Sequence, residues 1–254
     1  MKLKIITWNI GGGKILAEGK EVGPLASYVE DGWSHIVETL VQQDADIISL
    51  QETHKNKSYD LVEALAKELG YEHFFHDSTS PSHIDKNYSL GHGIISKYPI
   101  SDHIFKKFHN PKLQTEWEDG SIATSFDKGF SAVSIDVGIP VTVTTTHLIP
   151  FRRFGVEMNT ETADLILKDF EDKVPTQDAP WIVMGDFNID SPTIQGYFPN
   201  TFKSMSEINL EESTTPRGKK YDHILFKGFK VLEHKVLSSV KTDHYPVLAT
   251  IELI

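Results

Sequence analysis

The chain contains a series of short apolar segments with the length of β-strands, and a polar side chain follows almost every one. In the stretch WIVMGDFNID, residues 181–190, an apolar run ends at Gly185 and is followed at once by Asp186 and Asn188. Burial of an unpaired carboxylate is costly, whereas turns accept Asp, Asn and Gly readily. If the chain stays extended here, Asp186 and Asn188 point into the same space, because alternate side chains of a strand share a face. The rest of the sequence decides between a turn and a site.

Strand patterns outnumber helical ones along the chain. Helical periodicity is confined to residues 31–70 and 157–173, with Ser58 as the expected N-cap and Gly70 as the end of the second helix. Loops are expected at residues 76–90, 109–120 and 190–220, where polar residues, Pro and Gly gather. Strands are expected at residues 3–9, 45–52, 71–76, 91–100, 100–108, 121–127, 129–137, 140–148, 180–188, 221–226, 230–237 and 244–254. The pattern favours packed sheets with helices outside, in one domain over residues 1–254.

Composition narrows the class of protein. The 254 residues are 39% hydrophobic and 24% charged, as in ordinary globular proteins, and the net charge is −11. This charge disfavours broad attraction to a nucleic-acid backbone, although a bound divalent metal inverts the local charge. Without cysteine, any metal must be held by oxygen or nitrogen. The sequence has neither a signal-peptide pattern nor a membrane-length apolar run; we expect a cytoplasmic monomer, or a secreted one if a signal peptide has been removed.

Polar or ionisable residues stand at the ends of six of the predicted strands. Such coincidences predict one cleft, because ligand sites of α/β proteins gather at strand ends. Carboxylate and amide oxygens suit Mg²⁺, and hydrolysis of a phosphate ester needs a metal, a group that activates water and donors for the developing charge. These residues are Asn9, Glu52, His147, Asp186 with Asn188, Asp222, and Asp243 with His244.

Seven motifs occur in the order typical of the endonuclease/exonuclease/phosphatase superfamily, which includes deoxyribonuclease I. They are TWN, LQE, GHGIISKYPI, TTTHL, GDFN, YDHILF and TDHYPV, and together they span residues 5–251. The chain resembles this superfamily over nearly its whole length. The resemblance implies an α/β fold: a four-layered α/β/β/α sandwich of two packed mixed β-sheets, with helices outside and the site at one end.

The resemblance also implies roles for the strand-end residues. Glu52 resembles the principal Mg²⁺ ligand, with Asn9 and Asp243 as further contacts and Mn²⁺ as a possible substitute. Asp186 and Asn188 resemble the pair that directs the attacking water and holds a phosphoryl oxygen.

The two histidines also have counterparts in the superfamily. His244 resembles the catalytic histidine, either a base or a cation that stabilises the phosphorane, and Asp222 the carboxylate that orients it. His147 resembles the histidine on the scissile phosphate; the glutamate that orients it in deoxyribonuclease-like members has no counterpart in KNYSLGHGIIS. His92, in the same segment, is expected to line the pocket.

Other residues carry weaker expectations. Arg152 and Arg153 follow the strand of His147 and are expected to bind substrate at the rim, although exposed arginine pairs are usually only solvated. Asn159 stands where many members have an Arg. The second basic group, RGKK at residues 217–220, and Trp117 in its polar loop could each contact a substrate.

Three functions remain open at the level of sequence. The first is a Mg²⁺-dependent phosphodiesterase or nuclease that acts on nucleic acid, most of all DNA. The second is the same chemistry on a small-molecule or lipid-headgroup phosphate. The third, a non-catalytic binding module, fits poorly, because no position of the metal, base and orienting set has been lost.

Overall fold

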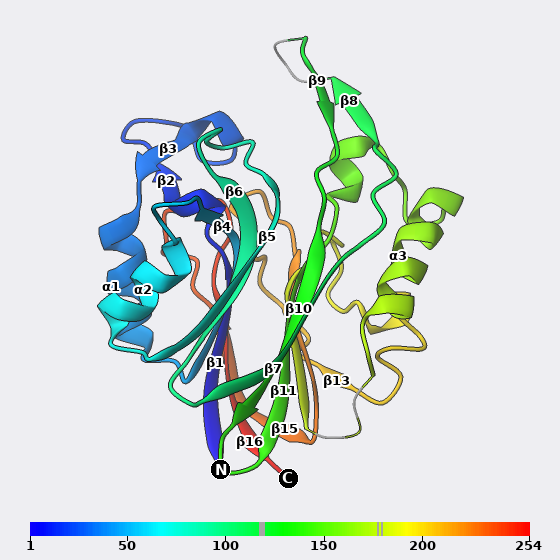
Figure 1. Ribbon diagram of the computed structural model, residues 1–254. Helices are drawn as coiled ribbons and strands as arrows, with labels where there is room; N and C mark the ends of the chain where they lie inside the picture. The colour runs from blue at the N-terminus through cyan, green and yellow to red at the C-terminus, as the bar shows by residue number, and fades with distance from the viewer. Residues whose placement is uncertain (117–119, 177, 179) are drawn as a thin grey trace.

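The computed structural model describes residues 1–116, 120–176, 178 and 180–254. Within these residues, the strands form two six-stranded sheets that pack face to face (Figure 1). The first sheet has the order β15 (Phe229–Val236), β16 (Val247–Leu253), β1 (Lys2–Asn9), β4 (Ile47–Lys55), β6 (Ser89–Ser96), β5 (His73–Pro81). The second has the order β13 (Ser206–Glu207), β14 (Asp222–Lys227), β12 (Trp181–Asp186), β11 (Pro140–His147), β10 (Gly129–Asp136), β7 (Ile100–Lys107).

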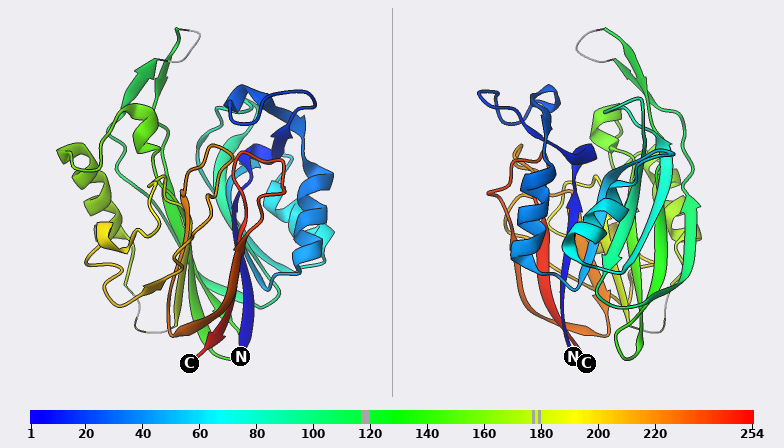
Figure 2. Two further views of the ribbon diagram at one scale, coloured as in Figure 1. Left: turned by 180° about the vertical axis from the view of Figure 1, so that it is seen from behind. Right: turned by 60° about the vertical axis from the view of Figure 1, so that its left-hand side comes forward.

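Helices cover the outer face of each sheet. α1 (Trp33–Gln43) and α2 (Leu61–Leu69) lie on the first sheet, and α3 (Glu161–Lys173) lies on the second (Figures 1 and 2). The expected four-layered sandwich of two mixed sheets with helices outside is therefore confirmed. No helix in the described ranges is long and apolar enough to cross a membrane.

Three apolar cores separate the four layers. Between the sheets, aliphatic side chains such as Ile5, Val143 and Met184 interdigitate, as the alternation along the strands requires. The core under α1 and α2 includes the buried Trp8. The core under α3 is rich in phenylalanine, and the ring of Phe170 packs at an angle against its neighbours, with a centroid distance of 4.6 Å to Phe198.

Two short hairpins rise beyond one end of the sandwich. β2 (Lys14–Leu16) pairs with β3 (Tyr28–Asp31), and β8 (Gln114–Glu116) pairs with β9 (Ile122–Thr124). Both stand at the end opposite the chain termini, on either side of the space above the sheets (Figures 1 and 2). The segment 109–120, expected to be a loop, thus contributes a strand.

Several predicted boundaries were wrong. β5 continues to Pro81, so the expected loop at residues 76–90 is shorter; an edge strand tolerates the Ser, Thr and Pro residues that suggested a loop. The N-cap of α2 is Asp60 and not Ser58: its carboxylate accepts hydrogen bonds from the backbone N–H groups of Val62 and Glu63, at 3.0 and 3.1 Å. Gly70 ends this helix in the left-handed conformation, as expected.

Candidate active site

The strand ends that carry the predicted residues meet at the end of the sandwich opposite the termini. β1 is parallel to β4, and β11 is parallel to β12, so the carboxyl ends of these four strands face the same way. The antiparallel neighbours β14 and β16 begin at this end. The two sheets thereby bring Asn9, Glu52, His147, Asp186, Asp222 and His244 together.

Asp186 lies at the centre of this group. Its side chain is 1% exposed, and its Oδ2 accepts a hydrogen bond of 3.0 Å from Asn9 Nδ2. Oδ2 also lies 3.4 Å from Nε2 of His147 and 3.7 Å from Nε2 of His244. Burial raises the pKa of Asp186, and the charge of His244 opposes this rise. Asp186 is therefore a buried carboxylate held between two imidazoles.

A close approach of two backbones positions Asp186 beside His147. Gly185 has φ 155°, and a Cβ there would lie 2.0 Å from the carbonyl oxygen of Thr146 on β11. Only glycine permits this contact. The register then pairs Asp186 directly with His147.

His244 is held by a second buried carboxylate. Its Nδ1 lies 2.8 Å from Oδ2 of Asp222, whose side chain is fully buried. The indole N–H of Trp8 donates to the carbonyl oxygen of His244 at 3.1 Å and fixes its backbone. Burial alone would lower the pKa of His244, but Asp222 and Asp186 outweigh it and raise the pKa above its ordinary value. The arrangement favours the imidazolium form.

Asn188 does not continue the strand. β12 ends at Asp186, and Asn188 has φ 53°, in the left-handed region. Its backbone N–H donates to Oδ1 of Asp186 at 2.9 Å, and its Nδ2 donates to the carbonyl oxygen of Leu148 at 3.0 Å. The stretch is thus both a turn and part of the site, and the turn fixes Asp186 through a backbone hydrogen bond.

Glu52 is directed into the site by an irregularity in β4. The pairing of β4 with β6 shifts between Gln51 and Thr53, and Glu52 between them has φ 53°. Such bulges redirect a side chain next to a site. Oε1 of Glu52 lies 3.6 Å from Nζ of Lys128 and 3.9 Å from Nε2 of His147. Burial would raise the pKa of Glu52, but the positive charges around it, that of Lys128 first among them, together outweigh burial, so the pKa is lowered.

Lys128 is a site residue that the sequence did not indicate. Its side chain is 8% exposed, and its Nζ lies 3.1 Å from both ring nitrogens of His147. Burial and the charge of Lys128 hold the pKa of His147 well below its ordinary value. Lys128 lies just before β10, in SFDKGF, where a lone lysine looks like a solvated loop residue. Its placement follows from the pairing of Gly129 with His147.

Asp243 lies beside the turn that follows β1. Its Oδ1 is buried and has no hydrogen-bond partner among the described residues. A Cβ on Gly11 would lie 3.0 Å from this oxygen. Burial raises the pKa of Asp243, and the charge of Glu52 contributes to the rise. Asn9, on the same turn, accepts a hydrogen bond from the N–H of Gly11 through its Oδ1.

Among the described residues, two groups that contain carboxylates could hold a cation. In one, ligand atoms of Asp186, Asp222 and His244 lie within 4.8 Å of one another, but the hydrogen bond between Asp222 and His244 already occupies two of these side chains. The other group consists of Glu52 and Asp243, whose carboxylates are near enough for the charge of Glu52 to act on Asp243. Gly11 links Asn9 to this pair, because its N–H donates to Oδ1 of Asn9 and a Cβ on it would meet Oδ1 of Asp243.

The basic residues of the rim differ in their surroundings. Burial lowers the pKa of Arg153, whereas the carboxylates of Glu52 and Asp243 oppose this, so Arg153 faces the acidic group. Arg152 is exposed, and its charge acts on Asp190.

The remaining candidates lie away from the site's centre or outside the structure's coverage. Lys219 pairs with Asp190 at 2.7 Å, and Lys220 donates to the carbonyl oxygen of Leu210. His92 is buried between the sheets, 2.7 Å from Oγ of Ser131. Trp117 lies outside the described residues.

Comparison with known proteins gives matches at the level of family and fold. A sequence model described as the Endonuclease/Exonuclease/phosphatase family matches residues 6–244. A comparison with curated proteins gives no match.

Three solved structures of low sequence identity have the same fold. An endonuclease/exonuclease/phosphatase from Beutenbergia cavernae is 19% identical, with a TM-score of 0.71 over 99% of this chain and 72% of that one. ANGEL2, a 2',3'-cyclic phosphatase in complex with adenosine-2',3'-vanadate, is 15% identical, with a TM-score of 0.68 over 100% and 96%. TDP2 from D. rerio, complexed with single strand DNA product, is 15% identical, with a TM-score of 0.59 over 99% of each chain.

Proposed function

Because the chain belongs to the endonuclease/exonuclease/phosphatase family, whose members are metal-dependent hydrolases of phosphate esters, we propose that it is a phosphodiesterase that cleaves nucleic acid, most of all DNA. The observation that carries the proposal is the buried Asp186, held between His147 and His244 within 3.7 Å of each. A carboxylate so placed can direct a water, and two imidazoles can contact the phosphate that the water attacks.

The acidic residues beside Asp186 fit a divalent cation. Asp243 keeps a buried oxygen without a hydrogen-bond partner among the described residues, and Glu52 directs a second carboxylate toward the same region. Hard oxygen ligands of this kind suit Mg²⁺, and Mn²⁺ also accepts them. We assign Glu52, Asp243 and the amide oxygen of Asn9 to this cation, which when bound would neutralise phosphoryl oxygens.

Asp186 and His244 have complementary parts in the hydrolysis. Asp186, fixed by Asn9 and by the backbone N–H of Asn188, holds the attacking water and accepts its proton. His244 meets the phosphate with Nε2 and stabilises its developing charge as a cation, because Asp222 fixes Nδ1. Asp222 is thus a positioning residue. This arrangement favours the cationic role of His244 over that of a base.

Positive and neutral donors complete the phosphate site. Lys128 lies beside His147, and its ammonium group also lies 3.6 Å from Oε1 of Glu52. Arg153 lies on the side of Glu52 and Asp243. Nδ2 of Asn188 carries a second hydrogen besides the one donated to Leu148. These groups are suited to bind the non-bridging oxygens of a phosphodiester.

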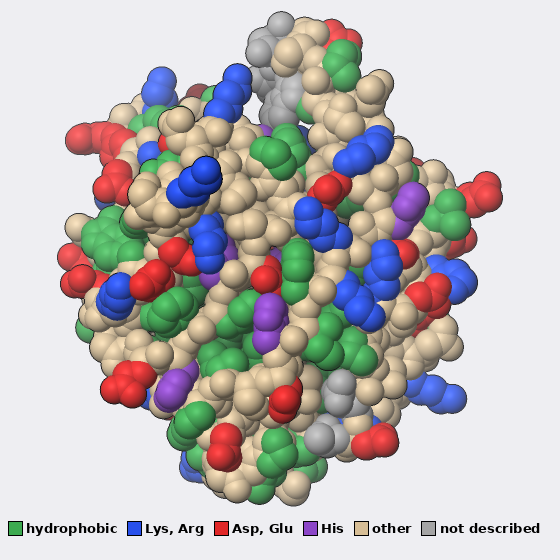
Figure 3. All heavy atoms as spheres, viewed as in Figure 1, with side chains coloured by type: hydrophobic (Ala, Val, Ile, Leu, Met, Phe, Trp, Pro, Cys, Tyr) green, Lys and Arg blue, Asp and Glu red, His purple; other side chains and the backbone are tan. Residues whose placement is uncertain are grey.

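Nucleic acid is the substrate class that we favour. On this fold, ANGEL2 is in complex with adenosine-2',3'-vanadate and TDP2 is complexed with single strand DNA product. The surface indicates how such a substrate would be held: Figure 3 shows acidic and basic side chains interspersed over the viewed face, without one continuous basic stripe. With a net charge of −11, recognition would depend on the site and on a nucleic-acid end more than on a long backbone track. The same surface is the observation that favours the second candidate, a small phosphoester.

The test is cleavage of labelled DNA in the presence of Mg²⁺. Single-stranded, duplex, abasic and 5′-tyrosyl-linked DNA would be compared, with EDTA and His244→Ala as controls. Metal-dependent cleavage that disappears in His244→Ala supports the proposal, and the preferred substrate identifies the subclass. Absence of cleavage of every DNA, with Mn²⁺ as well as Mg²⁺, would refute the DNA assignment and favour a small phosphoester.

A further inference from the structure

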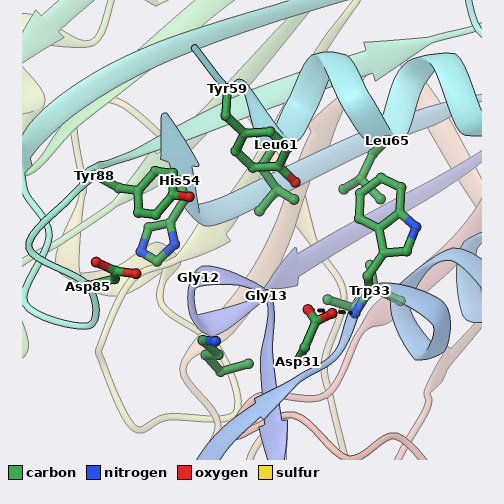
Figure 4. A pocket seen from close by; sticks show the side chains of 12 residues that line it. Gly12, Gly13, Asp31, Trp33, His54, Tyr59, Leu61, Leu65, Asp85 and Tyr88 are labelled. Carbon is green, nitrogen blue, oxygen red and sulfur yellow. Dashed lines mark hydrogen bonds between the residues drawn. The ribbon is translucent and has the colours of Figure 1, made fainter. Parts of the chain in front are cut away.

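A hollow lies beside the active site, on the other side of the turn Gly11–Gly13. Its volume is about 280 Å³, somewhat below the ~300–1,000 Å³ of sites that enclose drug-sized ligands. Aromatic side chains line it from separate parts of the chain, namely Trp33, His54, Tyr59 and Tyr88 (Figure 4). The volume suits one planar ring system.

One turn separates the hollow from the phosphate site. A Cβ on Gly11 would meet Oδ1 of Asp243 at 3.0 Å, whereas a Cβ on Gly12 would meet the ring of His54 at 2.5 Å. Adjacent residues of the turn therefore face the two sites. His54, which lines the hollow, follows Glu52 by two residues on β4. The hollow and the phosphate site thus share one wall, the turn Gly11–Gly13.

The walls of the hollow suit the flat face of a base. The rings of His54 and Tyr88 are stacked, with centroids 4.9 Å apart and planes inclined by 9°. Tyr59 stands on the edge of Tyr88, at 6.1 Å and 75°, and is 38% exposed. Bases stack on aromatic side chains of this kind regardless of their sequence.

The polar groups of the hollow suit the edge of a base. Asp31 and Asp85 offer hydrogen-bond acceptors, and Lys14 offers a donor. The edge of a nucleobase carries both donors and acceptors. A quaternary ammonium group would be attracted by the aromatic faces and the carboxylates, but the positive charge of Lys14 would repel it. The mixture of charges favours the base.

We propose that this hollow is a subsite for a nucleobase of the substrate, placed so that the base stacks against its aromatic wall while the adjoining phosphate occupies the active site. The proposal rests on the function proposed above and identifies its substrates as nucleotides. It predicts that base recognition depends on the ring of Tyr59 and on the carboxylates of Asp31 and Asp85.

Binding of nucleotides that are not turned over tests this subsite. Isothermal titration calorimetry in Mg²⁺ would compare AMP and GMP with ribose 5-phosphate, which has no base, and with phosphocholine. We expect the nucleotides to bind about tenfold or more tightly than ribose 5-phosphate, the effect of one stacked base. Tyr59→Ala should abolish this difference without weakening ribose 5-phosphate, whereas Tyr59→Phe and the exposed control Leu165→Ala should retain it.

The contrary outcomes are equally distinct. Equal wild-type affinities for AMP, GMP and ribose 5-phosphate would overturn the subsite, and so would an unchanged ratio in Tyr59→Ala. Tighter binding of phosphocholine than of either nucleotide would replace the base by an amine. The wild-type comparison needs neither a variant nor turnover, so failure of the subsite is separable from failure of DNA cleavage.

Discussion

Replacement of Asp222 by Asn tests whether this carboxylate positions His244. Oδ2 of Asp222 lies 2.8 Å from Nδ1 of His244, and the side chain is fully buried. Asparagine has the same shape, and its carbonyl oxygen can accept the same hydrogen bond. The substitution therefore removes the negative charge while the ring stays in place.

The size of the expected loss in kcat follows from the two carboxylates, Asp222 and Asp186, beside the ring of His244. In a serine-protease triad, the corresponding Asp→Asn change lowers kcat by about 10⁴-fold. Here Asp186 also lies 3.7 Å from the other ring nitrogen and retains part of the electrostatic stabilisation. We therefore expect kcat to fall by about 10²- to 10³-fold, the range for loss of one group that stabilises charge in the transition state.

The same substitution has a cost in stability. Oδ1 of Asp222 has no hydrogen-bond partner among the described residues, so the amide nitrogen of Asn would become a buried donor without an acceptor. Such a group costs about 1–3 kcal/mol in the free energy of unfolding. The melting temperature should fall by several degrees, which circular dichroism would measure alongside activity.

The assay is steady-state hydrolysis of bis(p-nitrophenyl) phosphate at saturating Mg²⁺, with kcat and KM determined separately over a range of pH. A positioning residue predicts a loss in kcat with little change in KM and an altered pH profile. Asp172→Asn, on the exposed face of α3, is the matched control. A wild-type kcat in Asp222→Asn, or a rise in KM alone, would refute the reasoning.

Three further predictions concern the site and its supports. Lys128→Met should lower kcat by about a hundredfold while the fold is retained, and unaltered kinetics would show that the ammonium group beside His147 has no part in the reaction. Gly185→Ala should lower the free energy of unfolding by at least about 2 kcal/mol, because its Cβ would lie 2.0 Å from the oxygen of Thr146; chemical denaturation measures this, and an unchanged midpoint would contradict it. Burial would raise the pKa of Asp60, but hydrogen bonds from its two basic partners hold the pKa well below its ordinary value. The contribution of Asp60 to the free energy of unfolding is therefore complete above about pH 4, the unfolded pKa, and is lost as pH falls through the folded pKa. The difference in this free energy between wild type and Asp60→Asn should shrink below about pH 4. A difference that is independent of pH would contradict this.

The sequence was informative where strand ends carried the chemistry. Asn9, His147 and Asp186 end strands that have a parallel neighbour, so a pattern of apolar runs followed by polar residues was enough to predict that they meet. Glu52 was also expected at a strand end, but β4 continues to Lys55. Their roles rest on the resemblance to the family and remain predictions. The position of Glu52 also depends on a bulge, which alternation of residues along a strand does not reveal.

Residues that reach the site only through the pairing of strands, and not through a pattern along the sequence, could not be predicted. Lys128 enters the site because β10 is antiparallel to β11, and a single lysine before a strand has no periodicity to mark it. The aromatic wall depends on His54 and Tyr88, which meet only when the loop after β5 folds over β4. Tertiary contacts of this kind leave no local signal.

Restoration of DNA cleavage by metal is the most direct test of the central claim. Protein treated with EDTA and then dialysed would be titrated with Mg²⁺ while cleavage of a labelled oligonucleotide is measured, for the wild type, Glu52→Gln and Asp243→Asn. We expect Mg²⁺ to restore cleavage in the wild type, whereas each variant should need a much higher Mg²⁺ concentration or stay inactive. Cleavage that persists without metal, or variants that respond to Mg²⁺ as the wild type does, would contradict it.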